Sequence, residues 1–139
     1  MIKSLNLPGI VAALVVTQGL SFLWYGQLFA ADLRALYPAM TPPSGAMTYL
    51  EGAALSLLML LGVGWIVGRL GSGSFFTGAR TGFFLWMFFP LPGELMRCVY
   101  MGEPIRGVAI DAGYELAYMI IAGALIGGLK FGGAKPAPA

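Results

Sequence analysis

The chain has 139 residues, of which 58% are hydrophobic and only 10% are charged, whereas roughly a quarter of the residues in soluble domains carry charge. Its net charge of +2 offers too little basic surface for a nucleic-acid partner. With no histidine and one cysteine, the chain cannot form a His-ligated haem, a zinc site of Cys and His ligands, a His-based triad or an internal disulfide. We therefore expect an integral membrane protein with no metal or cofactor, and we favour a function other than catalysis.

Long apolar segments predict an all-α bundle of four membrane-spanning helices, because about 20 apolar residues cross a bilayer core of about 30 Å. The connector at residues 32–45 contains several prolines and is expected to be a loop. The Gly-Ser-Gly-Ser run at 71–74 predicts a tight turn between antiparallel neighbours. Residues 1–131 are thus predicted to form a single domain, and the Gly-, Ala- and Pro-rich tail at 132–139 is expected to be disordered. The four spans are expected at about 9–30, 46–70, 75–99 and 105–129.

The third predicted span contains Pro90, Leu91, Pro92 and Gly93 in succession. Each proline removes a backbone donor and frees a carbonyl four residues earlier. We therefore expect this helix to be kinked or broken at Pro90 to Gly93.

The charged residues predict an orientation. With four spans, one side carries 5 basic residues (Lys3, Arg69, Arg80, Lys130 and Lys135) and the other carries 3 (Arg34, Arg97 and Arg106). The positive-inside rule then places both termini in the cytoplasm. All six acidic residues fall in the half away from the termini, where any functional site is therefore expected: Asp32, Glu51, Glu94, Glu103, Asp111 and Glu115.

Two segments, one near each end of the chain, resemble a known family. They are Leu23-Trp24-Tyr25-Gly26-Gln27-Leu28-Phe29 and Asp111-Ala112-Gly113-Tyr114-Glu115-Leu116, and they look like the small bacterial membrane proteins of domain of unknown function 1761. Gln27 and Asp111 stand where that family has Pro and Asn. The resemblance implies a four-span fold in the bacterial inner (cytoplasmic) membrane and carries no established activity.

The last predicted helix carries the strongest candidate site. Asp111, Glu115 and Tyr118 recur at i, i+4 and i+7, and Tyr114 lies beside them, so they share one helix face. Glu115 falls about 15 Å into the span, where a carboxylate is costly and needs a partner or a task. Glu94 and Arg97, three residues apart, can pair. Because a guanidinium can hold two carboxylates, Arg97 is the expected centre of a network with Glu94 and Glu115.

Other helices are expected to contribute polar groups to the same centre. Glu51 is a candidate from the second span, and Gln18, Ser21 and Tyr25 share a face of the first. A buried polar network in a small bundle can equally be interhelical glue, and we give the two interpretations of the network roughly even weight. For Glu115 we favour a functional role, and for Gln18 and Ser21 the structural one.

Small residues four apart predict close helix packing. The pairs are Gly64 and Gly68, Gly78 and Gly82, and Gly123 and Gly127. We favour packing within the chain over homodimerisation.

Three functions remain open. The first is an accessory or assembly subunit that contacts a membrane protein partner, since no cofactor motif or soluble domain is present. The second is a small-solute or proton-coupled transporter that works as an oligomer through the Glu, Arg and Asp cluster. The third is a membrane enzyme on a lipid-like substrate, with Asp111 or Glu115 as acid or base. We rank the accessory subunit first and the enzyme last.

Overall fold

The computed structural model describes residues 5–39, 41 and 45–129. Within these ranges every regular element is a helix, which confirms the all-α prediction. The predicted tail at 132–139 lies outside the described residues. The elements are α1 (Leu7–Leu23), the π-helical turn η2 (Trp24–Leu28), α2 (Ala30–Leu36), α3 (Ala46–Arg69), α4 (Phe75–Phe88), α5 (Pro90–Met101) and α6 (Ile105–Gly128).

Three of the described helices are long and apolar enough to cross a membrane: Leu7–Leu28, Ala46–Arg69 and Ile105–Gly128, with mean hydropathies of 1.7, 1.9 and 1.5. Large apolar side chains cover their outer surfaces, such as Val15 at 67% exposure and Leu55 at 68%. A surface of this kind is suited to lipid and not to water. The protein is therefore a membrane protein with three candidate spans in its described part.

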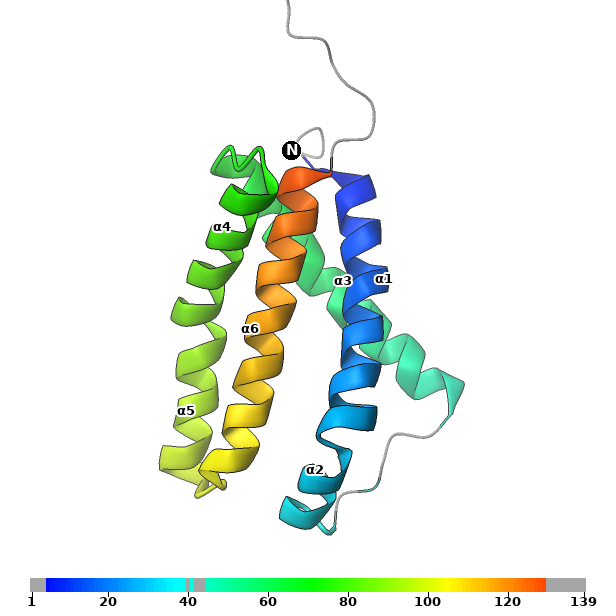
Figure 1. Ribbon diagram of the computed structural model, residues 1–139, viewed down its shortest axis with the longest axis vertical. Helices are drawn as coiled ribbons and strands as arrows, with labels where there is room; N and C mark the ends of the chain where they lie inside the picture. Colours follow the sequence, from blue (N-terminus) through cyan, green and yellow to red (C-terminus); the bar gives the residue numbers. More distant parts are fainter. Residues whose placement is uncertain (1–4, 40, 42–44, 130–139) are drawn as a thin grey trace, which may run out of the picture.

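The remaining predicted span is divided into two helices. α4 has 14 residues and α5 has 12, and each alone is shorter than the roughly 20 residues that a crossing needs. The break lies at Phe89, whose N–H donates to the Leu85 carbonyl at 3.0 Å. Pro90 has no N–H with which to continue the ladder and instead begins α5. The expected break is thus present at the start of the Pro90 to Gly93 run, and α4 and α5 lie end to end beside α6 (Figure 1).

The helices place the described ends of the chain together. The start of α1, the α3–α4 turn and the end of α6 lie at one end of the bundle, whereas α2, α5 and the start of α6 lie at the other, which we call the distal end (Figure 1). The connector expected to be a loop at 32–45 is helical in its first part, because α2 extends to Leu36. α3 crosses the bundle obliquely and diverges from α5 (Figure 1), so the predicted antiparallel pair of α3 and α4 meets only near its turn.

The buried core surrounds α6, which contributes Tyr118, Met119, Ala122 and Ile126, and it is completed by residues of α1 and the C-terminal half of α3. Asn6 joins the two ends of the described chain. Its side-chain oxygen accepts from the Gly9 N–H at 3.2 Å and so caps α1. Its amide nitrogen donates to the carbonyls of Ile126, at 2.7 Å, and Leu129 in the last turn of α6.

Glycines bring α4 and α6 into backbone contact. A Cβ placed on Gly78 would lie 2.0 Å from the Gly123 carbonyl oxygen, and one on Gly82 would lie 1.9 Å from that of Met119. A Cβ on Gly127 would lie 2.8 Å from the Ser74 carbonyl oxygen. Two of the three predicted pairs, Gly78 with Gly82 and Gly123 with Gly127, thus pack within the chain, and we call this contact the glycine seam. Gly64 lies elsewhere, where a Cβ would meet the Ile10 side chain of α1 at 2.9 Å.

Candidate functional site

Arg97 on α5 is the centre of a carboxylate network at the distal end. Its Nη1 donates to Glu94 Oε2 at 2.6 Å and to Asp111 Oδ2 at 3.0 Å, and its Nη2 donates to Glu103 Oε2 at 2.5 Å. Arg97 thus joins α5, the α5–α6 connection and α6. The predicted Glu94–Arg97 pair is present, but Asp111 and Glu103 occupy the positions that the sequence analysis gave to Glu115.

A left-handed residue at the end of α5 explains how Glu103 reaches Arg97. Gly102 adopts φ 67°, a conformation that glycine tolerates best. The chain then turns back, and the Glu103 N–H donates to the Arg97 carbonyl at 3.3 Å. The turn therefore brings the Glu103 carboxylate beside the guanidinium of the residue whose backbone it caps.

Tyr37, the residue that follows α2, joins the network through Glu103. Its hydroxyl donates to Glu103 Oε2 at 3.2 Å, a contact that was not expected from the sequence. The hydrogen bond from Arg97 is the main reason that the pKa of Glu103 lies below its ordinary value of 4.5. Desolvation, and then the Glu103 carboxylate, raise the pKa of Tyr37 above 10.0. Glu103 is therefore held as a carboxylate, and Tyr37 is held as its neutral donor.

The π-helical turn η2 joins α1 to the same network. An extra residue per turn often marks a functional position in a helix, and here η2 presents two adjacent aromatic donors to α6. Trp24 Nε1 donates to the Ile110 carbonyl at 3.1 Å, and the Tyr25 hydroxyl donates to Asp111 Oδ1 at 3.0 Å. Asp111 is thus held on one oxygen by Tyr25 and on the other by Arg97.

A cavity of about 340 Å³ lies beside this network, bounded by η2, α3, α5 and α6. Six of the eight residues that the sequence singled out line it: Glu94, Arg97, Asp111, Tyr114, Glu115 and Tyr118. Tyr25, Ser56 and Met59 also line it and were not among those eight. We call it the polar cavity.

Glu115 is the residue of this group that the network leaves free. Its Oε2 is buried and has no hydrogen-bond partner among the described residues. The nearby Tyr118 hydroxyl donates instead to the Ser56 carbonyl at 3.1 Å and so joins α6 to α3. Glu115 therefore lines the cavity and has one carboxylate oxygen that is buried and unpaired.

The last two of the eight residues lie elsewhere. Glu51 is exposed on the diverging N-terminal half of α3, and Gln18 is half-buried on α1. Neither lines the polar cavity. Within the described ranges, no group of three or more Cys, Asp or Glu side chains is arranged to hold a metal ion.

Comparison with known proteins assigns the chain to a family. The family model described as "Protein of unknown function (DUF1761)" matches residues 8–127. The chain belongs to this family. No curated protein and no solved structure matches the chain.

The two segments that resemble this family contact one another. Trp24 and Tyr25 of η2 bond the Ile110 carbonyl and the Asp111 side chain at the start of the other segment. A Cβ on Gly113 would lie 3.2 Å from the Trp24 ring, so a small residue suits that position. The two sequence segments therefore form one contact that joins α1 to α6 beside the polar cavity.

Proposed function

We propose that the protein is a proton-coupled transporter of a small solute in the bacterial inner membrane, with Glu115 as the proton-binding group. The observation that carries this proposal is the buried, unpartnered Glu115 Oε2 in the wall of the polar cavity. An unpartnered carboxylate in a medium of low dielectric is costly, so it binds a proton or a cation.

The charges around the cavity support a site for protons or cations. Its wall contains three carboxyl groups, those of Glu94, Asp111 and Glu115, and one guanidinium, that of Arg97. Arg97 is already bonded to Glu94, Glu103 and Asp111. Its positive charge is therefore largely compensated, and Glu115 faces the cavity with no cation of its own.

The proposed membrane arrangement has four spans, with α4 and α5 together forming the third. Discontinuous helices beside intramembrane charges are a feature of many transporters, and Pro90 at the α4–α5 break lines the polar cavity. The positive-inside rule favours cytoplasmic termini, which would place the distal end outside the cytoplasm.

An oligomer is part of this proposal. All buried residues of α3 lie in its C-terminal half, at Leu60, Val63, Gly64 and Val67, and its N-terminal half diverges from the bundle (Figure 1). Ser56 and Met59 at the edge of that half line the polar cavity. A second copy packed against α3 would cover the cavity wall on this side.

Proton flux in reconstituted liposomes tests the proposal. Glu115→Gln should abolish the flux that the wild-type protein gives under an imposed proton gradient, because the amide cannot carry the proton. Glu51→Gln, which makes the same change at an exposed position of α3, should retain it. Equal flux in wild type and Glu115→Gln would sink the proposal, provided that both proteins elute as folded particles.

The second candidate function is an accessory or assembly subunit of a membrane complex. The unpacked half of α3 favours it, since Met47, Leu50, Leu55 and Leu58 are each more than 60% exposed and offer apolar surface to a neighbouring helix. Purification in mild detergent followed by native mass spectrometry separates the candidates. A reproducible second protein would support the accessory function, a homodimer would support the transporter, and a lone monomer would count against both.

A further inference from the structure

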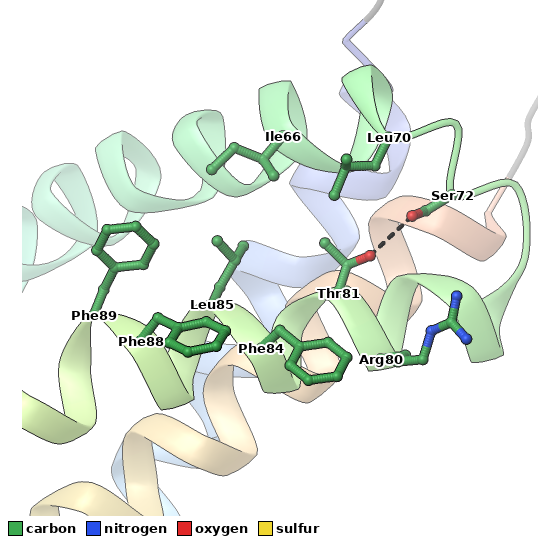
Figure 2. A pocket seen from close by; sticks show the side chains of 9 residues that line it. All are labelled: Ile66, Leu70, Ser72, Arg80, Thr81, Phe84, Leu85, Phe88 and Phe89. Atoms are coloured by element: carbon green, nitrogen blue, oxygen red, sulfur yellow. Dashed lines mark hydrogen bonds between the residues drawn. The ribbon is translucent and has the colours of Figure 1, made fainter.

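A second cavity, of about 360 Å³, lies between α3 and α4 near their turn, away from the α5–α6 network. Its wall is apolar over most of its length and polar at one end (Figure 2). The apolar part is formed by two aliphatic residues at the end of α3 and directly after it and by a row along α4 and its end: Ile66, Leu70, Phe84, Leu85, Phe88 and Phe89. We call this cavity the α3–α4 groove.

The polar end of the groove contains an unpaired arginine. Arg80 lines the groove, is exposed, and has no hydrogen bond or ion pair among the described residues. Beside it, the hydroxyls of Ser72 and Thr81 bond one another at 2.9 Å (Figure 2). Thr81 also donates to the Thr77 carbonyl at 3.0 Å, so the two hydroxyls are bonded within the chain. The groove therefore offers the Arg80 guanidinium as its free donor group at the end nearest the α3–α4 turn.

The charged residues near this end of the groove are all basic. No acidic residue occurs between Glu51 and Glu94, so the part of α3 that lines the groove, the α3–α4 turn and α4 contain no carboxylate that could neutralise Arg80. Arg69 in the last turn of α3 adds a second positive charge and stacks on the Trp65 ring at 5.5 Å. A negatively charged group is the complement of this surface.

The groove also has the length of one membrane leaflet. From Arg80 to Phe88 the helix rises about 12 Å, which is close to half of the roughly 30 Å hydrocarbon core. Arg80 lies within two turns of the start of α4, where a long side chain reaches the interface.

We propose that the α3–α4 groove binds one anionic phospholipid, with its phosphate at Arg80 and one acyl chain along Phe84, Leu85 and Phe88. The charged end selects the headgroup, and the apolar wall holds the chain. The site is independent of the polar cavity and of the proposed transport function, because it uses neither Glu115 nor Arg97.

Native mass spectrometry of the delipidated full-length protein tests this site. The probes are phosphatidylglycerol and phosphatidylcholine with identical acyl chains. The wild-type protein should retain one phosphatidylglycerol in preference to phosphatidylcholine. Arg80→Gln should lower phosphatidylglycerol retention about fivefold, as expected for one arginine near an anionic headgroup. Arg34→Gln makes the same charge change on exposed α2 at the distal end and should leave retention unchanged.

A second variant tests the acyl-chain part of the groove. Phe84→Ala, at a position that is 46% exposed, should weaken retention of both lipids and leave the headgroup preference intact. Equal retention of the two lipids by the wild-type protein would overturn the proposal. So would an equal loss in Arg34→Gln and Arg80→Gln, or unchanged retention in Phe84→Ala, which would place the lipid outside the groove.

Discussion

The two sides of α6 are built in opposite ways. On one side, α4 approaches so closely that any Cβ at Gly78 or Gly82 would collide with backbone carbonyls. On the other side, α3 diverges and leaves the polar cavity, where Glu115 Oε2 has no partner. Close backbone contact holds the helices together, and the charged groups lie where the helices separate. The comparison indicates that the glycine seam provides stability, which leaves the opposite side free to hold a costly carboxyl group.

Breaking the glycine seam should have the largest effect. Gly82→Ala would place a methyl group 1.9 Å from the Met119 carbonyl oxygen, and backbone on both sides prevents easy relaxation. We expect destabilisation of about 3 kcal/mol, at the upper end of the range for overpacking. Thermal unfolding in detergent measures it. Gly62→Ala, where a Cβ would meet nothing within 4 Å, is the control and should be neutral or slightly stabilising. Equal stability of the two variants would refute the seam.

Removing the centre of the Arg97 network should have the second-largest effect on stability. Arg97→Gln would leave Glu94, Glu103 and Asp111 without their shared cation. We expect a loss of about 2 kcal/mol, below the value for a fully buried pair because the Arg97 side chain is 31% exposed. Chemical unfolding compared with Arg34→Gln checks this, and a loss no greater than in that control would show that the network is unimportant for folding.

The sequence predicted that Glu115 belongs to the candidate site. It did not predict that Asp111, and not Glu115, would pair with Arg97. The i, i+3 spacing of Glu94 and Arg97 predicted their pair, and the four-residue glycine spacings predicted the seam. The partner of Arg97 on α6 depends on how far α5 is displaced along α6. That displacement is set by the Gly102 turn and the Pro90 break, which sequence spacing does not encode. As a result Asp111, one turn before Glu115, meets the guanidinium.

Two further features of the fold, the π-helical turn η2 and the oblique path of α3, could not be predicted from the sequence. The π-helical turn at Trp24–Leu28 has no pattern of its own, so the bond from Trp24 to α6 was not expected, although Tyr25 was expected near the polar centre. The oblique path of α3 depends on packing along its whole length and could not be predicted. Glu51 was therefore expected at the polar centre, although the N-terminal half of α3 diverges from it. The family segments indicated that η2 and the start of α6 matter, but not that they contact one another.

A smaller effect should follow from the contact between η2 and α6. Tyr25→Phe removes the hydroxyl that donates to Asp111 at 3.0 Å and should cost about 1 kcal/mol, the usual net value of one hydrogen bond. Thermal unfolding against Tyr49→Phe, at a tyrosine that is 63% exposed, provides the comparison. If both substitutions have the same effect, the η2 contact does not hold Asp111.

The smallest effect concerns acid stability. Because Arg97 lowers the pKa of Glu103 in the folded protein below 4.5, the contribution of this carboxylate is complete above pH 4.5. It is lost as the pH falls through the lowered folded-state pKa. The difference in melting temperature between wild type and Glu103→Gln should therefore be constant near neutrality and shrink in acid. A difference that grows as the pH falls would contradict the assignment.

The central claim, that the polar cavity beside α6 is open to water, is tested most directly by thiol labelling. In a Cys98→Ser background, Ser56→Cys places a thiol on the polar cavity wall, and Leu58→Cys places one on a side chain that is 67% exposed on the same helix. A charged, membrane-impermeant thiol reagent should label Cys at position 56 and not at position 58, because only the cavity admits water. Labelling of neither position, or of both equally, would contradict the account.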